Sequence, residues 1–395
     1  MLHADYVRVF SYYDDWLDAF REYPGFQVTT INVVDRNVGK ILEPAIAVAD
    51  LVVLLHSVTG DTVKYLRPLT TVLQHRRGRL LAFVGNEVNL PGTLISAKRK
   101  VLEQISPEFI ATQLPLKAGQ FLFGDLAKNR VLEVPHALNP GKYLPGPNYS
   151  ERAIDIGTRV ARYLPHLGDD ERNRIHDYFT SYGASRFGFK MDLSNERMTR
   201  GEWADFLQSC RGTVSTEAGS WYLEKDDHTV ESIRGWARRR EKRGYTLGAD
   251  SILNSLVECM PSFSRPVLKA IKNFGLVKHE LAAANDLSFE EVHEEFFKNY
   301  KKPEFYGKCI SSRHFDAVGT KTCQIMFSGR FNDILVAGKH YIALERDFSN
   351  IDEVIERFTD ADHWKLIVDE AYESVMDQHT YHHRLQRLYG ALTCA

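Results

Sequence analysis

The first 135 residues alternate between short apolar runs and longer segments in which apolar and polar residues mix. Continuous apolar runs such as LVVLL at 51–55 and LLAFV at 80–84 are typical of strands covered on both faces of a sheet. The strands predicted in this half span residues 6–10, 26–31, 51–55, 80–84 and 131–134. Amphipathic helices, for example 62–75 and 94–104, fall between them. This alternation predicts a parallel, doubly wound sheet with right-handed crossovers.

A stretch rich in proline and glycine, residues 139–151, precedes a second α/β series. Its predicted strands are residues 153–156, 187–190, 212–215 and 323–327. Thr199 and Glu202 form a capping box that begins a helix over 199–210, with Trp203 and Phe206 on its apolar stripe. Ser349 is the predicted N-cap of a later helix, which begins at about Ile351.

The pattern therefore predicts two Rossmann-like domains, 1–138 and 152–375, joined by the linker 139–151. Residues 223–300 are rich in charged helix formers and carry no convincing strand, so we interpret them as a helical insertion in the second domain. The tail is helical in pattern, and we expect residues 376–395 to pack back on the first domain. Two such domains face each other across a central cleft, where the carboxyl ends of both sets of strands would hold a ligand.

Composition narrows the class of protein. Of 395 residues, 44% are hydrophobic and 26% are charged, which is typical of a globular protein and excludes a disordered chain. Lys and Arg total 50 and Asp and Glu total 52, giving a net charge of −2. Proteins that bind nucleic acid electrostatically carry a basic excess, so we expect no nucleic-acid partner.

Cysteine spacing and the length of apolar runs indicate the cellular compartment of the protein. The five cysteines are widely spaced and form no CxxC, which argues against a disulfide framework or a zinc ribbon. The N-terminal residues lack the pattern of a signal peptide, and no apolar stretch approaches the length of a spanning helix. We therefore expect a cytoplasmic protein with reduced thiols.

Two common nucleotide motifs are absent, since there is no GxGxxG after the first strand and no GxxxxGK[ST]. The more informative stretch is residues 311–342. Ser311 or Ser312 can cap a short helix ending at Gly319, whose free N–H groups would attract an anion, with Arg313 adding a positive charge. Asp316 could accept hydrogen bonds from ribose hydroxyls. An ordinary capped helix with solvated Arg and Asp is the alternative.

This segment resembles the C-terminal domain of GT-B glycosyltransferases, in particular bacterial enzymes of the glycosyl-transferase group 1 and spore-maturation-protein type. Those enzymes carry a motif like S-x-R-x-F-E-A-x-G-T, followed by one like G-x-H-Y-I-x-L-x-x-D-F-S-N. The matching positions here are Ser311, Arg313, Phe315, Asp316, Ala317, Gly319 and Thr320, then Gly338, His340, Tyr341, Ile342, Leu344, Asp347, Phe348, Ser349 and Asn350. The resemblance covers most of residues 130–360.

The resemblance implies a pair of carboxylates that serve a nucleotide-sugar donor, one near the sugar ring and one on the ribose. The ribose carboxylate corresponds to Asp316, one methylene shorter than the usual Glu. Lys308 stands eight residues earlier, where the first Glu is expected, so we assign that role to Glu217 in the segment STEAGS. An exposed loop carboxylate is the alternative for Glu217.

The donor diphosphate would be held by cations and backbone donors, which are most effective where charge develops on the leaving group. The candidates are Arg186 and Lys190 beside the predicted strand at 187–190, together with Arg313, Ser312 and the N–H groups of Gly319 and Thr320. A solvated basic residue is the default alternative for any one of them.

On the acceptor side, Glu87 follows a first-domain strand and could be a general base or an acceptor ligand. Asn86 could orient a sugar hydroxyl. His56 also follows a strand, although a structural histidine is the commoner finding there, and His136 stands at the domain junction. The densest basic run, from Arg238 to Arg243, is either a solvated helix face or a contact with an anionic membrane surface or lipid diphosphate.

The sequence therefore predicts a glycosyltransferase that moves a sugar from a nucleotide-sugar donor to a glycan, lipid-linked or small-molecule acceptor in bacterial polysaccharide or glycoconjugate synthesis. We expect no cofactor and no metal, because the chain carries no spaced DxD at a strand end. The alternatives are a nucleotide-sugar epimerase of the same fold and a non-catalytic binding protein.

Overall fold

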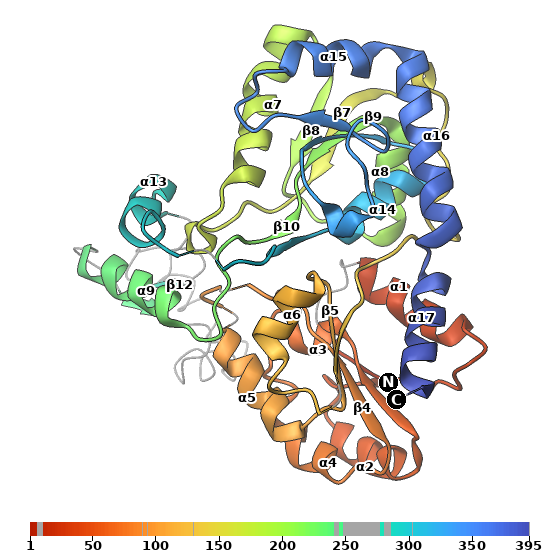
Figure 1. Ribbon diagram of the computed structural model, residues 1–395, viewed down its shortest axis with the longest axis vertical. Coiled ribbons are helices and arrows are strands. Elements are labelled where there is room, and N and C mark those ends of the chain that lie inside the picture. Colours follow the sequence, from red (N-terminus) through yellow and green to blue (C-terminus); the bar gives the residue numbers. More distant parts are fainter. Residues whose placement is uncertain are drawn as a thin grey trace, which may run out of the picture.

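The computed structural model describes residues 1–5, 11–88, 90–92, 94–128, 130–240, 245–247, 277–279, 286–301 and 303–394. Within these ranges the chain forms two α/β lobes, one above the other in Figure 1. Each lobe is built on a sheet whose neighbouring strands all run parallel. The prediction of an α/β protein with two Rossmann-like domains is confirmed.

The first sheet has the strand order β2-β1-β3-β4-β5-β6. Its strands are β1 (Leu2–His3), β2 (Ile31–Asn32), β3 (Leu51–Leu54), β4 (Arg79–Phe83), β5 (Phe109–Thr112) and β6 (Arg130–Glu133). The strands predicted at 51–55, 80–84 and 131–134 are confirmed, whereas the strand predicted at 6–10 lies outside the described residues. The strand predicted at 26–31 forms only at its last residue, because Phe26 packs against Phe20, Tyr23 and Tyr389 instead. Strand β5 was not predicted.

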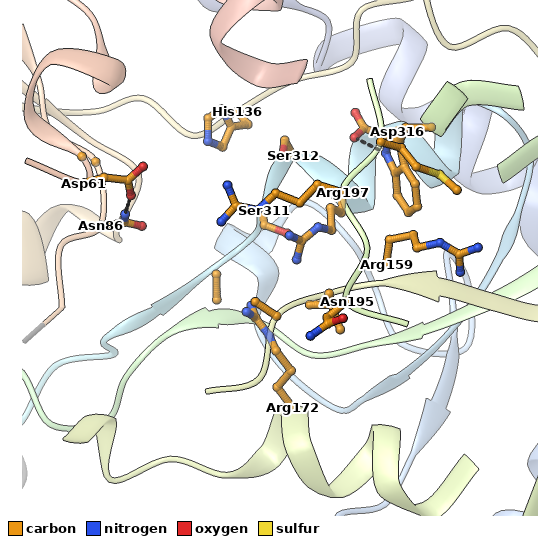
Figure 2. Close-up of a pocket in the computed structure, with 18 of the residues that line it drawn as sticks. Asp61, Asn86, His136, Arg159, Arg172, Asn195, Arg197, Ser311, Ser312 and Asp316 are labelled. Atoms are coloured by element: carbon orange, nitrogen blue, oxygen red, sulfur yellow. Dashed lines mark hydrogen bonds between the residues drawn. The ribbon is translucent and has the colours of Figure 1, made fainter. Parts of the chain in front are cut away.

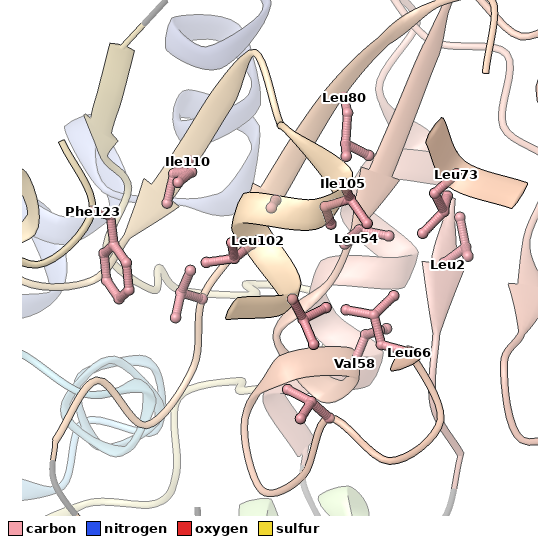
Figure 3. Packing of buried hydrophobic residues seen from close by; sticks show 14 of the residues in the cluster. Leu2, Leu54, Val58, Leu66, Leu73, Leu80, Leu102, Ile105, Ile110 and Phe123 are labelled. Carbon is pink, nitrogen blue, oxygen red and sulfur yellow. The ribbon is translucent and has the colours of Figure 1, made fainter. Parts of the chain in front are cut away.

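Helices cover both faces of the first sheet (Figure 1). They are α1 (Ser11–Glu22), α2 (Val38–Val48), α3 (His56–Thr59), α4 (Thr70–Gln74), α5 (Ile95–Ile105) and α6 (Leu116–Phe123). The helix predicted over 62–75 is shorter, because Pro68 lies at the start of a 3-10 turn, Arg67–Leu69, just before α4. Figure 3 shows α5 burying Leu102 and Ile105 against Leu54 and Leu80 of the sheet.

The second sheet has the order β15-β14-β9-β7-β8. Its strands are β7 (Ile154–Arg159), β8 (Met191–Ser194), β9 (Cys210–Ser215), β14 (Cys323–Phe327) and β15 (Ile342–Leu344). The strand predicted at 187–190 is wrong. Phe187 ends helix α7 (Glu171–Phe187), Gly188 caps that helix with a φ of 70°, and the strand begins only at Met191.

The remaining second-domain helices are α8 (Arg200–Ser209), α14 (Ser312–Gly319), α15 (Ile351–Thr359) and α16 (Ala361–Gln378). The capping box at the start of α8 is confirmed, since Thr199 and Glu202 bond each other's backbone N–H groups. The N-cap of α15 is Asn350 rather than Ser349, because the Ser349 N–H donates to Asp347 in a turn before the helix.

The insertion begins after β10 (Ala218–Gly219), which pairs with β13 (Lys308–Cys309) in an antiparallel ribbon. It contains helix α9 (His228–Arg240), helix α13 (Phe289–Val292) and a π-helical turn, His293–Phe297. Two short parallel strands, β11 (Tyr245–Leu247) and β12 (Val277–His279), correct the expectation that this region holds no strand.

The chain crosses between the domains twice, and the two crossings lie side by side. The Leu138 N–H donates to the carbonyl of His379, and the Tyr381 N–H donates to the carbonyl of Leu138, each over 3.0 Å. Beyond this point α17 (Tyr381–Thr393) packs on the first domain, where Tyr381 and Leu385 join Trp16 and Phe20 in one apolar cluster. The last helix of the chain therefore completes the core of the first lobe (Figure 1).

Candidate active site

A cavity of about 270 Å³ lies between the two domains. From the first domain it is lined by residues that follow strands β3 to β6, among them Asp61, Asn86, Gln113 and His136. From the second it is lined by the ends of β7 and β8 and by the start of α14. Much of the lining therefore comes from the carboxyl ends of parallel strands and the loops that follow them, which is where open α/β sheets bind ligands. Figure 2 shows the labelled side chains around this space.

The second-domain wall is built around the amino end of α14. Ser311 is the N-cap, and Ser312 and Arg313 come next, so the amino end of α14 and a guanidinium share this corner of the cavity. Asp316 lies one turn further and is 2% exposed. Its Oδ2 accepts a hydrogen bond from Trp203 Nε1 at 2.9 Å, as the dashed line in Figure 2 shows. Burial, reinforced by Asp15, holds the pKa of the Asp316 carboxyl well above its ordinary value.

Four arginines line the cavity, and all come from the second domain: Arg159, Arg172, Arg197 and Arg313. Together with burial, the positive charge of two of these arginines lowers the pKa of two neighbouring histidines, His314 and His176. Burial, together with the charges of Arg172 and Arg313, lowers the pKa of His314 to about 3 and that of His176 to about 4. This side of the cavity is therefore strongly electropositive and suited to an anion.

The first-domain wall is held by a buried lysine. Asn86 has a φ of 47°, and its side chain donates to Asp61 at 2.6 Å. Lys98, 1% exposed, donates to the carbonyls of Gly85 and Asn86, each at 2.6 Å, and so fixes this turn. Burial lowers the pKa of Lys98 to about 7.

His136 faces the same cavity from the end of β6. Its Nδ1 accepts from Trp16 Nε1 at 3.1 Å, so in the neutral ring the proton is on Nε2. Burial lowers the pKa of His136 to about 3, which keeps the ring neutral near pH 7. A neutral His136 ring can thus donate a hydrogen bond only from Nε2, and it does not act as a base near pH 7.

The structure brings together six of the side chains singled out from the sequence: Asp316, Arg313, Ser311, Ser312, Asn86 and His136 all line this cavity. The other candidates lie elsewhere. His56 is 1% exposed and packs between Trp16, Phe83 and His136. It is therefore a structural histidine, the commoner of the two interpretations given for it from the sequence.

Glu87 does not line the cavity. Its side chain turns inward and accepts from the Thr112 hydroxyl and from the Gln113 N–H, the latter at 3.3 Å. Burial raises the pKa of Glu87 to about 7. Glu87 therefore supports the loop that carries Gln113 into the cavity, and the expectation that it points into the cleft is wrong in this arrangement.

Glu217 is also turned away, although its neighbour Ala218 lines the cavity. Its carboxylate accepts from the Tyr306 hydroxyl and from the Phe331 N–H at 2.7 Å, and the residue is 3% exposed. Burial raises the pKa of this carboxyl. Glu217 is thus neither the exposed carboxylate of the alternative nor a side chain presented to the cleft. Lys308, at the position of the missing Glu, is buried between Asp169 and Glu171 at 2.6 and 2.5 Å.

The remaining diphosphate candidates lie outside the cavity. Gly319 and Thr320 stand at the carboxyl end of α14, where Gly319 packs on Leu138, whereas the N–H groups that face the cavity are at the amino end. Arg186 and Lys190 precede β8 and so lie at the opposite edge of the sheet. Arg186 is paired there with Asp352 at 2.6 Å.

Sequence reasoning missed Arg159, Arg172 and Arg197, as well as Asp61 and Asn195. Arg159 is the last residue of β7, and Asn195 is the first residue after β8. Strand ends placed three residues later for β7 and four residues later for β8 would have put both at the cleft. Within the described part of the chain, no group of three or more His, Cys, Asp or Glu side chains could hold a metal ion.

No protein-family model and no curated protein matches the sequence. Solved structures do match. An alpha-glucosyltransferase in complex with UDP and a 13-mer DNA is 7% identical with a TM-score of 0.52, over 99% of this chain and 98% of that one. The HepE protein of Anabaena in complex with UDP-glucose is 10% identical with a TM-score of 0.47, over 93% and 86%. Sucrose-phosphate synthase from Thermosynechococcus elongatus is 12% identical with a TM-score of 0.42, over 94% and 82%. The first of these shows that the chain has the GT-B fold.

Proposed function

We propose that this protein is a glycosyltransferase that takes a sugar from a nucleoside-diphosphate sugar and passes it to a hydroxyl group of a glycan, lipid-linked or small-molecule acceptor. The observation that supports this best is the cavity itself. It joins the carboxyl edges of two parallel sheets, with Arg313 and the amino end of α14 beside the buried carboxyl of Asp316. A structural neighbour with the same fold is an alpha-glucosyltransferase in complex with UDP, so we propose a UDP-sugar as the donor.

Each group has a role in this proposal. Arg172, Arg313 and the N–H groups at the start of α14 hold the diphosphate and stabilise its charge as the bond to the sugar breaks. Asp316 accepts from the ribose hydroxyls. His136 donates through Nε2 to a sugar oxygen. Asp61 is the first-domain carboxylate of the cavity, and we assign it the acceptor-side position that Glu87 was expected to take.

The first test is calorimetric titration with UDP of the wild-type protein, Arg313→Gln and Arg186→Gln. Arg313→Gln removes one charge-assisted contact, so we expect its Kd to rise about tenfold or more. Arg186→Gln is the matched control, because Arg186 is an exposed arginine paired with Asp352 far from the cavity, and its Kd should not change. Equal Kd values in all three proteins would contradict the proposed donor site.

Turnover separates this proposal from an epimerase or a non-catalytic protein. UDP-sugar donors are incubated with and without candidate acceptors, and UDP release and sugar identity are followed. We expect UDP release that depends on the acceptor and is unchanged by EDTA, because arginines supply the charge at the diphosphate. Conversion of the donor sugar without an acceptor would indicate the epimerase. Tight UDP binding with no turnover on any acceptor would favour a binding protein.

We further propose that the acceptor is carried at a membrane surface or by a glycan rather than by DNA. Arg238 to Arg240 lie at the end of α9, where Arg240 pairs with Glu291 at 2.8 Å, and residues 241–243 of the basic run lie outside the described residues. None of the helices in the described ranges combines the length and hydropathy that a bilayer span needs. Sedimentation with anionic vesicles, and a gel shift with duplex DNA as the contrasting arm, test this expectation.

A further inference from the structure

A second cavity, of about 420 Å³, lies at the hinge between the domains. It is enclosed by the end of β6, by the turn Phe331–Asp333 of the second domain, and by α17. It shares no lining residue with the cavity between the sheets. It is therefore a separate space, next to the two chain crossings and to the cluster of Trp16 and Tyr381.

The wall formed by α17 carries a buried arginine. Arg384 is 4% exposed, and its Nε donates to the carbonyl of Pro135 at 3.1 Å. Its Nη2 lies 3.1 Å from Nδ1 of His379. Among the described residues no carboxylate lies within ion-pair distance of this guanidinium. The Glu133 carboxylate attracts Arg384 only from beyond that distance. A buried cation without a paired counter-ion is costly, so the site favours an anion that brings one.

Further donors converge on the same space. Arg387 lines the cavity one turn further along α17. Because Arg384 donates to Nδ1 of His379, the neutral ring carries its proton on Nε2 and offers a second kind of donor. Burial, with Arg384 and Arg387, lowers the pKa of His379 to about 4, so its surroundings are electropositive.

The two carboxylates that line the cavity are already engaged. Glu133 accepts from Asn332 Nδ2 and from the Leu116 N–H, both at 2.8 Å. Asp333 is paired with Arg330. Neither carboxylate therefore forms an ion pair with Arg384. The guanidinium groups of Arg384 and Arg387, both on α17, are not neutralised by these two carboxylates.

From this arrangement we propose that the hinge cavity is a second ligand site, for a phosphomonoester or free phosphate held by Arg384, Arg387 and His379. Guanidinium groups bind phosphate oxygens in pairs, and two of them with one imidazole N–H match the oxygens of a tetrahedral dianion. The cavity is larger than phosphate alone needs, and Leu132, Val134 and Leu388 offer apolar contact to a small organic body. Pro135, which holds Arg384, directly precedes His136 of the other cavity, so an occupant acts on a segment that both cavities share.

Calorimetric titration with inorganic phosphate and with glycerol 3-phosphate tests the site on the full chain. The variants are Arg387→Gln, Arg313→Gln and, as control, Arg357→Gln, an exposed arginine of α15 paired with Glu353. We expect Arg387→Gln to weaken phosphate binding about tenfold, the effect of one charge-assisted contact. Arg313→Gln, at the other cavity, and Arg357→Gln should retain a phosphate site of wild-type affinity. Phosphate binding that is unchanged by Arg387→Gln, lost in Arg313→Gln, or absent altogether would overturn the proposal.

Histidine NMR gives a second readout that does not depend on the proposed transferase activity. A bound dianion beside His379 should raise its pKa from about 4 by stabilising the protonated ring. The signal is assigned with His379→Gln. We expect phosphate to shift this titration upward in the wild type and much less in Arg387→Gln. A titration that phosphate leaves unmoved in the wild type argues against the site. Tighter binding of glycerol 3-phosphate than of phosphate identifies an organic ester as the occupant, and equal binding identifies free phosphate.

Discussion

Asp316 combines a buried carboxyl group with a place on the wall of the cleft. Its Oδ2 is taken by Trp203, which leaves the other oxygen for a ligand. Asn has only one side-chain oxygen. If that oxygen accepts from Trp203 in Asp316→Asn, the NH₂ group faces the cavity, where a ribose hydroxyl needs an acceptor. We predict that UDP binds about tenfold more weakly to this variant, whereas pyrophosphate, which has no ribose, binds as to the wild type. Equal weakening of both ligands in calorimetry would remove the ribose assignment.

His314 gives a pH-dependent prediction. Its pKa is about 3 in the folded protein because it is buried, whereas an unfolded histidine titrates near 6.5. Between pH 6.5 and pH 3 the histidine is protonated in the unfolded chain but neutral in the folded protein. His314 therefore lowers the free energy of unfolding as the pH falls below 6.5. We predict that the stability deficit of His314→Gln relative to the wild type shrinks by about 2 kcal/mol between pH 7 and pH 5. Urea unfolding at both pH values measures it, and a constant deficit would contradict the assignment.

Asn86 was found from the sequence by its place after a strand, and Asp316 and Arg313 by the capped-helix pattern and the family motif they match. Place after a strand was not enough for Glu87 and Glu217, although both follow predicted strands. Whether such a carboxylate faces the cleft depends on its hydrogen-bond partners. Those of Glu217 are Tyr306 and Phe331, which lie about ninety or more residues further along the chain. The other three cavity arginines, Arg159, Arg172 and Arg197, carry no local signature, because a role at the cleft depends on which chain segments face it.

Helix α14 meets the linker at one glycine. A Cβ on Gly319 would lie 2.5 Å from Leu138 Cδ1 and 2.8 Å from the carbonyl oxygen of Tyr143, closer than real contacts allow. We predict that Gly319→Ala lowers the free energy of unfolding by about 1–3 kcal/mol, as overpacking does. Gly390→Ala is the matched control. Gly390 lies inside α17 with open space around it, so alanine should raise stability by about 0.5–1 kcal/mol. Urea unfolding of both variants checks the opposite signs.

At the scale of elements, the sequence predicted long apolar strands and well-capped helices best. Strands β3 and β4 contain continuous apolar runs, β14 is apolar except for Gln324, and α8 has a complete capping box. Strand β5 was missed because its four residues, FIAT, offer no periodicity that separates a buried strand from a helix. The apolar residues near 187–190 were misassigned because Phe187 and Phe189 pack in the second-domain core from a helix end and a turn.

At the scale of the molecule, α17 follows the second domain in the sequence but packs on the first domain. We predict that cleavage at a protease site inserted between the exposed residues Gly141 and Lys142 leaves the two fragments associated, because Leu385 and Leu388 stay in the first-domain cluster. Size-exclusion chromatography should give one species of about the intact mass, 45.2 kDa. Adding Leu388→Asp to the cleavable protein should release the fragments. Separation without that substitution would show that α17 does not hold the domains together.

The position of α17 also sets an order of events during synthesis. Trp16 and Phe20 leave the ribosome early, yet Tyr381, Leu385 and Leu388, which cover them, come from the last fifteen residues of the chain. The first lobe therefore cannot close its core while the second lobe is being made. Trp16 and Phe20 have to wait until residues 381–388 have been made, and a nascent chain that stops before residue 381 leaves them uncovered, where a chaperone could recognise them.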